Sequence, residues 1–430
     1  MNIKKLTILV AAILLLAPAL RSEQRDSLIV SLVTCWPGPE VYELCGHEAI
    51  RIRSASPQAD MDSVWNYGIF SFDQPNFIYR FVKGETDYKL AGYPFEWFMP
   101  EYQEQGRRVE EQVLNLNQEE AHKLLALLRE EAKPENCTYR YNYVLDNCAT
   151  RPIERIGQSS GKRVIYPDSA AYGTFRNTMR HYHRGYPWYQ FGIDICLGSG
   201  IDRPINGHGE MFAPVEMYRK VAGAHFEDGT PLVLHTNVLN QGVEDATSGP
   251  TPWYLTPIFW SLALLGITAL LAFRMIRKRT IYRPVYSAWF GLIGITGCVV
   301  AFLLFVSTHE ATTPNLNFFW LNPLQLVLAL GVWWRSWRPA AIAMAWVDML
   351  LIVILLLVWP WQHQSANIAF FPLMGVTLLL AAVYAIIAPK QSYKYNNEKV
   401  VNLGAGSRNS RRSSGAGRRR PTASGGRNRR

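Results

Sequence analysis

The feature that most constrains this chain is a nearly unbroken apolar region from residue 254 to residue 388. It contains five apolar stretches, each close to the ~20 residues that a membrane-spanning helix needs. The stretches lie at about 254–273, 285–306, 318–334, 341–361 and 367–388, and the third is at the short end. We therefore expect an all-α membrane domain of five transmembrane helices over residues 254–388.

The loops between these stretches alternate in charge, which predicts the orientation of the membrane domain. Lys and Arg gather after the first and third stretches, whereas the loops at 307–317 and 362–366 contain neither. Because basic loops face the cytoplasm, five spans place the preceding domain outside and the tail inside. Lys4 and Lys5 precede an apolar run and an Ala-Pro-Ala sequence, a pattern typical of a signal peptide over residues 1–21. An uncleaved anchor is the alternative, and both require an exported domain.

The basic character of the chain belongs to its tail. The net charge is +10, but residues 389–430 alone hold three Lys, nine Arg and one Glu. The rest of the chain is therefore close to neutral, and its charge indicates no class of ligand. The Gly/Ser/Arg-rich tail cannot bury a core, and we expect a disordered cytoplasmic segment attracted to anionic lipid headgroups. Nucleic-acid binding is the alternative for any Arg-rich tail, and we do not expect it here.

Residues 22–253 have the composition of a mixed globular domain. A helix should begin at Gln118, because Asn117 can cap it and Glu120 completes a capping box. A second helix should start near Cys148, and two or three more should follow. Strands followed by helices indicate an α+β domain rather than alternating β/α units. The predicted strands lie near 28–35, 47–53, 63–72 and 107–116.

A cysteine at the start of a helix is a candidate nucleophile. The N–H groups and the dipole of a helix N-terminus stabilise a thiolate, so we expect the pKa of Cys148 to be lowered. The same N–H groups can bind the oxyanion that forms when a thiol attacks a carbonyl. The alternative is a buried structural thiol or half of a disulfide. Five of the six cysteines lie in the globular domain, which leaves at least one free, and Cys45 with Cys137 is one possible pair.

A histidine on an early strand can serve as the base for such a thiol. His47 opens its predicted strand and points to the face away from Ile50. An ordinary half-buried histidine is the alternative reading. A third residue should orient the imidazole ring. Asn66 on the next predicted strand is our candidate, and Asp62 and Asp73 are competitors.

Together these segments resemble a known family. A histidine on an early strand, a polar residue on the next and a later Asn-Cys at a helix start resemble the circularly permuted branch of the papain-like NlpC/P60 superfamily. More closely, the chain resembles the bacterial lipoprotein N-acyltransferases of the Lnb type over nearly its whole length, the Arg-rich tail excepted. The chain departs from the family pattern at two positions, Cys45 and Cys137, and neither belongs to the candidate pair of Cys148 and His47. The matching segments are Thr34-Cys35-x-Pro37-Gly38, Gly46-His47-x-Ala49-Ile50-Arg51, Asn66-Tyr67-Gly68-x-Phe70-x-Phe72, Pro75-Asn76-Phe77, Glu111-Gln112-x-Leu114-Asn115-Leu116 and Asp146-Asn147-Cys148-Ala149-Thr150-Arg151.

The resemblance implies an acyltransferase of the bacterial inner membrane with its catalytic domain in the periplasm. Cys148 would take an acyl chain from a phospholipid as an S-acyl intermediate, and the N-terminal amine of a lipidated lipoprotein would receive it. His47 would be the base and Asn66 its orienting residue. We also expect four residues to bind substrate: Thr150 and Arg151 beside the cysteine, and His309 and Asn315 in a polar exported loop. Alternatively, this loop is an ordinary solvated turn.

Two other functions remain compatible with the sequence. The same Cys–His pair could hydrolyse cell-wall peptides, as in many NlpC/P60 relatives, or the exported domain could be a non-catalytic receptor. No HxxxH or CxxC pattern and no Gly-rich phosphate loop is present, so we expect neither a metal nor a cofactor. Asp348 lies inside the fourth apolar stretch, where an ionisable group normally faces the bundle interior. Asn322 and Gln325 are its possible partners.

Overall fold

The computed structural model describes residues 27–56, 61–244 and 249–390. The chain forms two compact units. We call them the sheet unit, which holds the chain up to Pro257 together with Val300–Leu316 and Trp361–Asn367, and the helical unit, which holds the remainder. The predicted signal peptide and almost all of the predicted basic tail lie outside the described residues.

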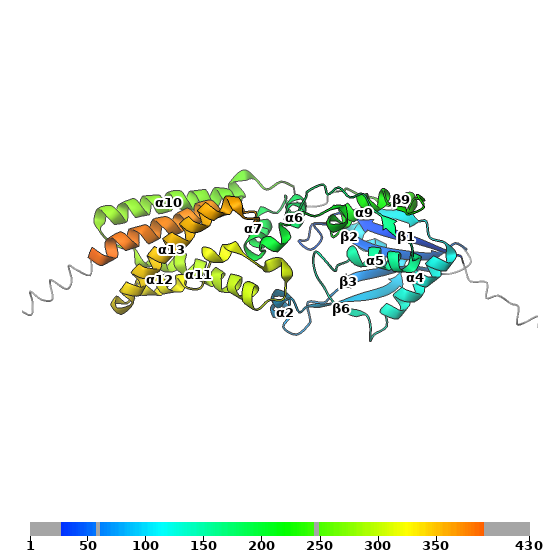
Figure 1. The fold of residues 1–430 in the computed structure, drawn as a ribbon, viewed down its shortest axis with the longest axis horizontal. Helices are drawn as coiled ribbons and strands as arrows, with labels where there is room; N and C mark the ends of the chain where they lie inside the picture. The colour runs from blue at the N-terminus through cyan, green and yellow to red at the C-terminus, as the bar shows by residue number, and fades with distance from the viewer. Residues whose placement is uncertain (1–26, 57–60, 245–248, 391–430) are drawn as a thin grey trace, which may run out of the picture. The chain divides into compact units, whose positions relative to one another are not determined.

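The sheet unit is built on a seven-stranded antiparallel sheet with the strand order β6-β4-β3-β2-β1-β5-β9 (Figure 1). The four predicted strands are confirmed as β1, β2, β3 and β5, whereas β4, β6 and β9 were not predicted. The sequence of β4 contains Lys, Gly and Pro, which weaken a strand signal. The strands are β1 Leu28–Cys35, β2 His47–Ser54, β3 Asp62–Ile69, β4 Asp87–Pro94, β5 Arg108–Leu114, β6 Thr138–Arg140 and β9 Val233–Gln241, with a separate pair of β7 Val164–Ile165 and β8 His225–Phe226.

Helices connect and cover these strands, so the α+β class is confirmed. The capping box of α4 is present as predicted: the Asn117 side chain accepts from the Glu120 N–H at 2.9 Å, and the Glu120 carboxylate accepts from the Asn117 N–H at 2.9 Å. The helices of the sheet unit are α2 Phe77–Lys83, α3 Phe95–Glu104, α4 Gln118–Glu131, α5 Thr150–Ser160, α6 Phe175–Tyr182, α7 Pro187–Cys196, α8 Gly207–Glu210 and α9 Pro214–Ala222.

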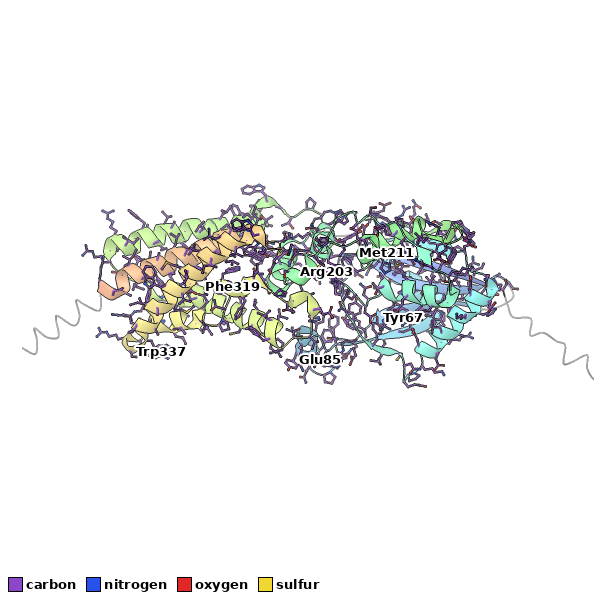
Figure 2. The ribbon with its side chains drawn as sticks, in the orientation of Figure 1. Tyr67, Glu85, Arg203, Met211, Phe319 and Trp337 are labelled. Carbon is purple, nitrogen blue, oxygen red and sulfur yellow. The ribbon has the colours of Figure 1, made fainter. Side chains whose placement is uncertain are left out.

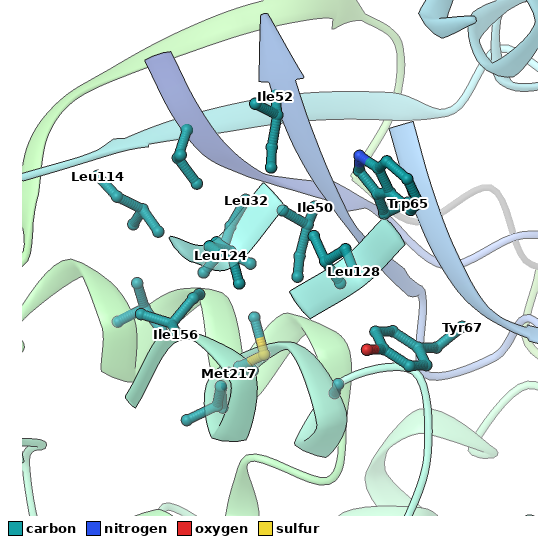
Figure 3. Close-up of a cluster of buried hydrophobic side chains, with 14 of the residues drawn as sticks. Leu32, Ile50, Ile52, Trp65, Tyr67, Leu114, Leu124, Leu128, Ile156 and Met217 are labelled. Atoms are coloured by element: carbon teal, nitrogen blue, oxygen red, sulfur yellow. The ribbon is translucent and has the colours of Figure 1, made fainter. Parts of the chain in front are cut away.

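Each face of the sheet packs on its own hydrophobic cluster. One cluster joins β1 and β2 to α4, α5 and α9, and it contains Ile50, Leu128, Ile156 and Met217 (Figure 3). The other joins the opposite face to α3 and contains Ala49. Neighbouring residues of β2 therefore enter different clusters, as the alternation of the strand predicts. This double packing fixes the register of β2 and with it the position of the site at its first residue.

The helical unit differs from the prediction of five long helices. Among the described residues, four helices are long and apolar enough to cross a membrane. The third predicted stretch, 318–334, instead contains a seven-residue helix, α12, between short 3₁₀ turns. Pro323 explains the difference, because proline lacks an N–H donor and disfavours helix at the residue before it, Asn322. The bounds are α10 Pro257–Lys278, α11 Arg283–Phe305, α12 Gln325–Gly331, α13 Arg338–Val358 within the apolar segment Arg335–Trp361, and a last helix Phe370–Lys390.

Two further features of this region match the sequence. The loops without Lys or Arg, 307–317 and 362–366, fall almost entirely within the two segments that belong to the sheet unit. In the helical unit, Asp348 is fully buried, and its Oδ1 accepts a hydrogen bond from Nε2 of Gln325 at 2.9 Å. The predicted pairing of Asp348 with Gln325 is therefore confirmed, whereas Asn322 bonds the carbonyl of Phe319.

Candidate active site

His47 and Asn66 form a hydrogen-bonded pair on neighbouring strands. Nε2 of His47 lies 2.7 Å from Oδ1 of Asn66, and Nδ2 of Asn66 donates to the Tyr93 hydroxyl at 2.9 Å. An amide oxygen only accepts hydrogen bonds, so Nε2 carries the ring proton and Nδ1 is left to accept another. The arrangement prepares the ring to act as a base through Nδ1.

The two competing aspartates lie elsewhere. Asp62, at the start of β3, accepts from Nε of Arg51 at 2.8 Å. Asp73 is exposed in the turn after β3, where its N–H bonds the Ser71 hydroxyl oxygen. The structure therefore brings Asn66, and neither aspartate, to the His47 ring.

Strands β2 and β3 stop pairing at this end of the sheet. Their register ends at Ile50 and Trp65, and β3 then shifts register against β4. Gly68 lies within this irregularity at a φ of +91°, which favours glycine. A Cβ at Gly68 would lie 3.8 Å from Cβ of Cys148 and 3.8 Å from Cε2 of Tyr141. These are ordinary contact distances, so the irregular part of β3 packs directly beside the cysteine.

The backbone around Cys148 is fixed by the side chain of Asn147. Oδ1 of Asn147 accepts from the N–H groups of Ala149 at 2.8 Å and Thr150 at 3.0 Å, and its Nδ2 donates to two backbone carbonyls. These bonds fix the turn that leads into α5, which begins at Thr150. They hold Cys148 at the N-terminus of the helix, where the sequence predicts it.

The thiol of Cys148 lies next to the segment that carries His47. The backbone N–H of Glu48, the residue after His47, faces the sulfur, and so does the N–H of Cys148 itself. Among the described residues, no hydrogen bond joins Cys148 to the His47 ring. Catalytic hydrogen bonds are often long before substrate binds and shorten in the complex. Backbone N–H groups beside a nucleophilic sulfur can donate to an oxyanion that forms there.

The electrostatics of the thiol differ from the prediction. Burial raises the pKa of Cys148 to about 12, an effect that Glu48 and Cys45 reinforce and that the two backbone N–H groups oppose. The predicted lowering by the helix N-terminus is therefore wrong in direction, because the thiol is only 9% exposed and its charged form loses hydration. Cys148 is a neutral thiol at pH 7.

His47 is neutral at pH 7 for the same reason. Burial lowers the pKa of its ring to about 4, the bond to Asn66 opposes this shift, and the charge of Arg107 adds to it. A neutral imidazole can take a proton, whereas an imidazolium cannot. The site therefore suits general-base activation of a thiol during attack, rather than a preformed thiolate–imidazolium pair.

Glu48 is a buried acid at the site that the sequence did not single out. Its Oε2 accepts from the Thr34 hydroxyl at 2.7 Å, and among the described residues Oε1 has no hydrogen-bond partner. Burial raises the pKa of Glu48 well above its usual range. A signal was present, because Glu48 shares a strand face with the apolar Ile50, and a carboxyl group at an apolar position is unusual.

The two predicted substrate-binding residues after Cys148 take part in local structure. The hydroxyl oxygen of Thr150 accepts from the N–H of Asn147 at 2.8 Å. Arg151 forms two hydrogen bonds to Asp146, at 2.5 and 2.8 Å, and its guanidinium lies 3.6 Å from the centre of the Tyr139 ring. Both residues stabilise the segment that positions the cysteine, and their roles in substrate binding stay predictions.

The two predicted loop residues also bond within the sheet unit. Nε2 of His309 lies 2.8 Å from the carbonyl oxygen of Phe81 at the end of α2. Asn315 is buried, its Nδ2 donates to the carbonyl of Ile195 at 3.0 Å, and its Oδ1 accepts from Gln364 at 3.1 Å. The loop is thus a structured part of the sheet unit, and substrate binding by these residues stays a prediction.

The six cysteines are all free, including the candidate pair Cys45 and Cys137. Cys45 is buried with its sulfur 3.4 Å from the Tyr143 hydroxyl. Cys137 lies in the turn after α4, close to the Pro134 carbonyl. The possible disulfide between them is therefore not formed.

The fold and the site define a class of protein: a membrane protein whose α+β domain holds a cysteine at a helix N-terminus and a hydrogen-bonded histidine and asparagine on neighbouring strands. Residues 17–176 match the family model of the Lnb N-terminal periplasmic domain, and residues 250–392 match that of the Lnb transmembrane domain. The chain belongs to the Lnb family, and it is an inner-membrane protein with a periplasmic N-terminal domain. No curated protein and no solved structure matches it.

Proposed function

We propose that this protein transfers an acyl chain from a phospholipid to the N-terminal amine of lipidated lipoproteins, through an S-acyl intermediate on Cys148. The observation that carries the proposal is the position of the Cys148 thiol. It lies at a helix N-terminus, faces the Glu48 N–H, and adjoins the strand segment of the His47–Asn66 pair. If the segment 318–334 crosses the membrane in addition to the four long helices, the five crossings place the C-terminal tail in the cytoplasm, as the basic loops predict.

In the first half-reaction, Nδ1 of His47 takes the thiol proton as the sulfur of Cys148 attacks the ester carbonyl. The oxyanion of the tetrahedral intermediate accepts from the N–H groups of Glu48 and Cys148. The C–O bond then breaks, and His47 returns its proton to the departing lysophospholipid oxygen. The acyl group remains on the sulfur as a thioester.

In the second half-reaction, the lipoprotein amine attacks this thioester. A C–N bond forms, the C–S bond breaks, and His47 carries the amine proton to the departing sulfur of Cys148. The products are an amide and the original thiol. An amine attacks a thioester more readily than an ester, which favours the covalent route.

The burial of Cys148 supports transfer over hydrolysis. A thioester on a thiol that is only 9% exposed has little access to bulk water. A hydrolase acting on cell-wall peptides needs a water molecule at this position in every cycle. The exclusion of water also strengthens the donors that face the oxyanion.

The test is mass spectrometry of lipoprotein N-terminal peptides from cells that contain this protein as their sole N-acyltransferase. We expect wild type to yield the N-acylated peptide and Cys148→Ser to yield the free amine. Cys137→Ser is the matched control, because Cys137 is also a free thiol of the sheet unit but lies in the turn after α4. A free amine from wild type as well would reject lipoprotein acylation, and release of soluble cell-wall peptides would then favour the hydrolase.

A further inference from the structure

An open apolar groove lies beside α2 within the sheet unit. Its volume is about 750 Å³, inside the range of roughly 300–1,000 Å³ for sites that hold small-molecule ligands. Among the residues that the structure describes, no charged side chain lines it. Phe302 comes from the last turns of α11, a helix apolar enough to cross a membrane. The lining residues are Phe72, Asn76, Phe77, Ile78, Tyr79, Val82 and Phe302.

Helix α2 exposes apolar side chains although its backbone is held in place. It contains no buried residue, and Ile78 is 78% exposed. The loop after α11 fixes it: the Thr308 N–H donates to the Lys83 carbonyl at 2.8 Å, and the Ser307 hydroxyl donates to the Val82 carbonyl at 2.9 Å. In Figure 2 the end of α2 is marked by Glu85, just beyond the helix. An exposed apolar patch on an ordered element indicates a binding surface for an apolar partner.

Aromatic rings connect this groove to the cysteine. The ring of Phe77 lies 5.9 Å from that of Phe70, Phe70 lies 5.1 Å from Tyr88, and Tyr88 stacks on Tyr141 at 4.2 Å, all between centroids. Tyr141 and Cys148 meet at Gly68, where a Cβ would lie 3.8 Å from an atom of each side chain. We call Phe77, Phe70, Tyr88 and Tyr141 the aromatic track.

We infer that the groove and the aromatic track bind the acyl chain that is transferred, with its carbonyl carbon at the sulfur of Cys148. The inference rests on the proposed function and adds the path of the donor chain. An acyl chain offers no directional bonds, so a row of flat apolar surfaces is the complement it needs, and each buried methylene stabilises the complex.

The place where the track ends indicates that it binds the acyl chain of the donor and not the lipid chains of the acceptor. Only the chain that becomes a thioester must run up to Cys148, and the track ends at Tyr141, which meets Cys148 at Gly68. The acceptor must instead bring its amine to the thioester, so its own lipid chains need not lie along the track.

The test compares two acyl donors with the full-length protein in detergent micelles, without acceptor. The donors are dipalmitoyl phosphatidylethanolamine and p-nitrophenyl butanoate, and the readout is the rate of S-acylation of Cys148 by intact-protein mass. Ile78→Asp places a charge in the groove, and we expect at least about a tenfold slower reaction with the palmitoyl lipid and an unchanged reaction with the butanoyl ester. Ile78→Leu should retain both rates.

Trp97→Asp is the matched control, because Trp97 is an aromatic residue on α3, 68% exposed and outside the groove. We expect it to leave both rates unchanged. Equal losses with both donors, or no loss with either in Ile78→Asp, would overturn the inference. A loss confined to transfer onto an added lipoprotein peptide would assign the groove to the acceptor and overturn it as well. Wild type that reacts with the butanoyl ester but with no phospholipid would reject the proposed function itself.

Discussion

Nε2 of His47 lies 2.7 Å from Oδ1 of Asn66, and this contact leaves Nδ1 as the ring nitrogen that can accept a proton. The amide can hold the ring only if its oxygen faces His47, and the Tyr93 hydroxyl secures that orientation by accepting from the amide nitrogen at 2.9 Å. In the reaction that we propose, Asn66 acts through His47 as a positioning residue.

Replacing Asn66 with Ala should slow the formation of acyl-Cys148 by about 10- to 100-fold, because the ring loses its fixed tautomer and orientation. The loss should lie in the maximal rate and leave the concentration of phospholipid at half-saturation nearly unchanged. Single-turnover acylation followed by intact-protein mass measures both quantities. Tyr93→Phe removes only the outer partner and should cause a smaller loss. An Asn66→Ala protein with an unchanged maximal rate would contradict this role.

The pH dependence of acylation should follow from the pKa of His47, which burial lowers to about 4. The base must be neutral to accept the thiol proton, so the active fraction is full above the pKa and declines as the pH falls through about 4. We expect the rate to stay nearly constant from pH 7 down to about 5, whereas an ordinary histidine would lose activity below about 6.5. An acidic limb centred near 6.5 in the rate profile would contradict the buried, neutral ring.

The reactivity of the free thiol gives a separate test of the same electrostatics. Because burial raises the pKa of Cys148 to about 12, alkylation by iodoacetamide should be slow at pH 7 and should rise with pH through the alkaline range, as the thiolate fraction grows. A thiolate–imidazolium pair would instead react at a rate that is constant above about pH 5. Peptide mass spectrometry of the alkylated site distinguishes the two profiles, and Cys148→Ser assigns the signal.

The charge state of Glu48 can be tested by an isosteric change. Burial raises the pKa of Glu48 well above its usual range, which favours the neutral carboxylic acid, so the neutral isostere in Glu48→Gln should alter acylation by less than about threefold. If Glu48 were ionised, removing its charge would lower the pKa of Cys148 and speed alkylation at pH 7. Glu48→Ala removes the acceptor of the Thr34 hydroxyl and should lower the free energy of unfolding by about 1–3 kcal/mol. Faster alkylation in Glu48→Gln would reject the protonated state.

Helix α4 and strand β2 could be predicted because the residues that determine them lie close together in the sequence. The cap of α4 depends on Asn117 and Glu120, three residues apart, and both side chains act as predicted. The two faces of β2 follow from its alternation, and this alone places His47 at the site. The pairing of His47 with Asn66 was also accessible, since neighbouring strands bring residues on one face together.

Properties that depend on burial could not be predicted in the same way. The pKa of Cys148 is governed by how deeply the thiol is packed, and the sequence around the residue shows only the helix N-terminus that opposes this effect. The short α12 has a similar cause, because hydropathy alone does not register the break at Pro323. The aromatic track joins residues from β4, the chain after β3, α2 and the chain after β6, and no spacing along the sequence brings them together.

The buried pair in the helical unit allows a test by a double-mutant cycle. Nε2 of Gln325 donates to Oδ1 of Asp348 at 2.9 Å, both side chains are fully buried, and among the described residues Oδ2 of Asp348 and Oε1 of Gln325 lack partners. Gln325→Leu should therefore destabilise the protein in detergent by about 1–3 kcal/mol, because it leaves the carboxyl group without its donor. The double variant with Asp348→Leu should recover most of this loss, since a half-satisfied buried pair is less stable than an apolar one. Thermal unfolding of the four proteins measures the coupling, and strictly additive losses would show that the hydrogen bond contributes nothing to stability.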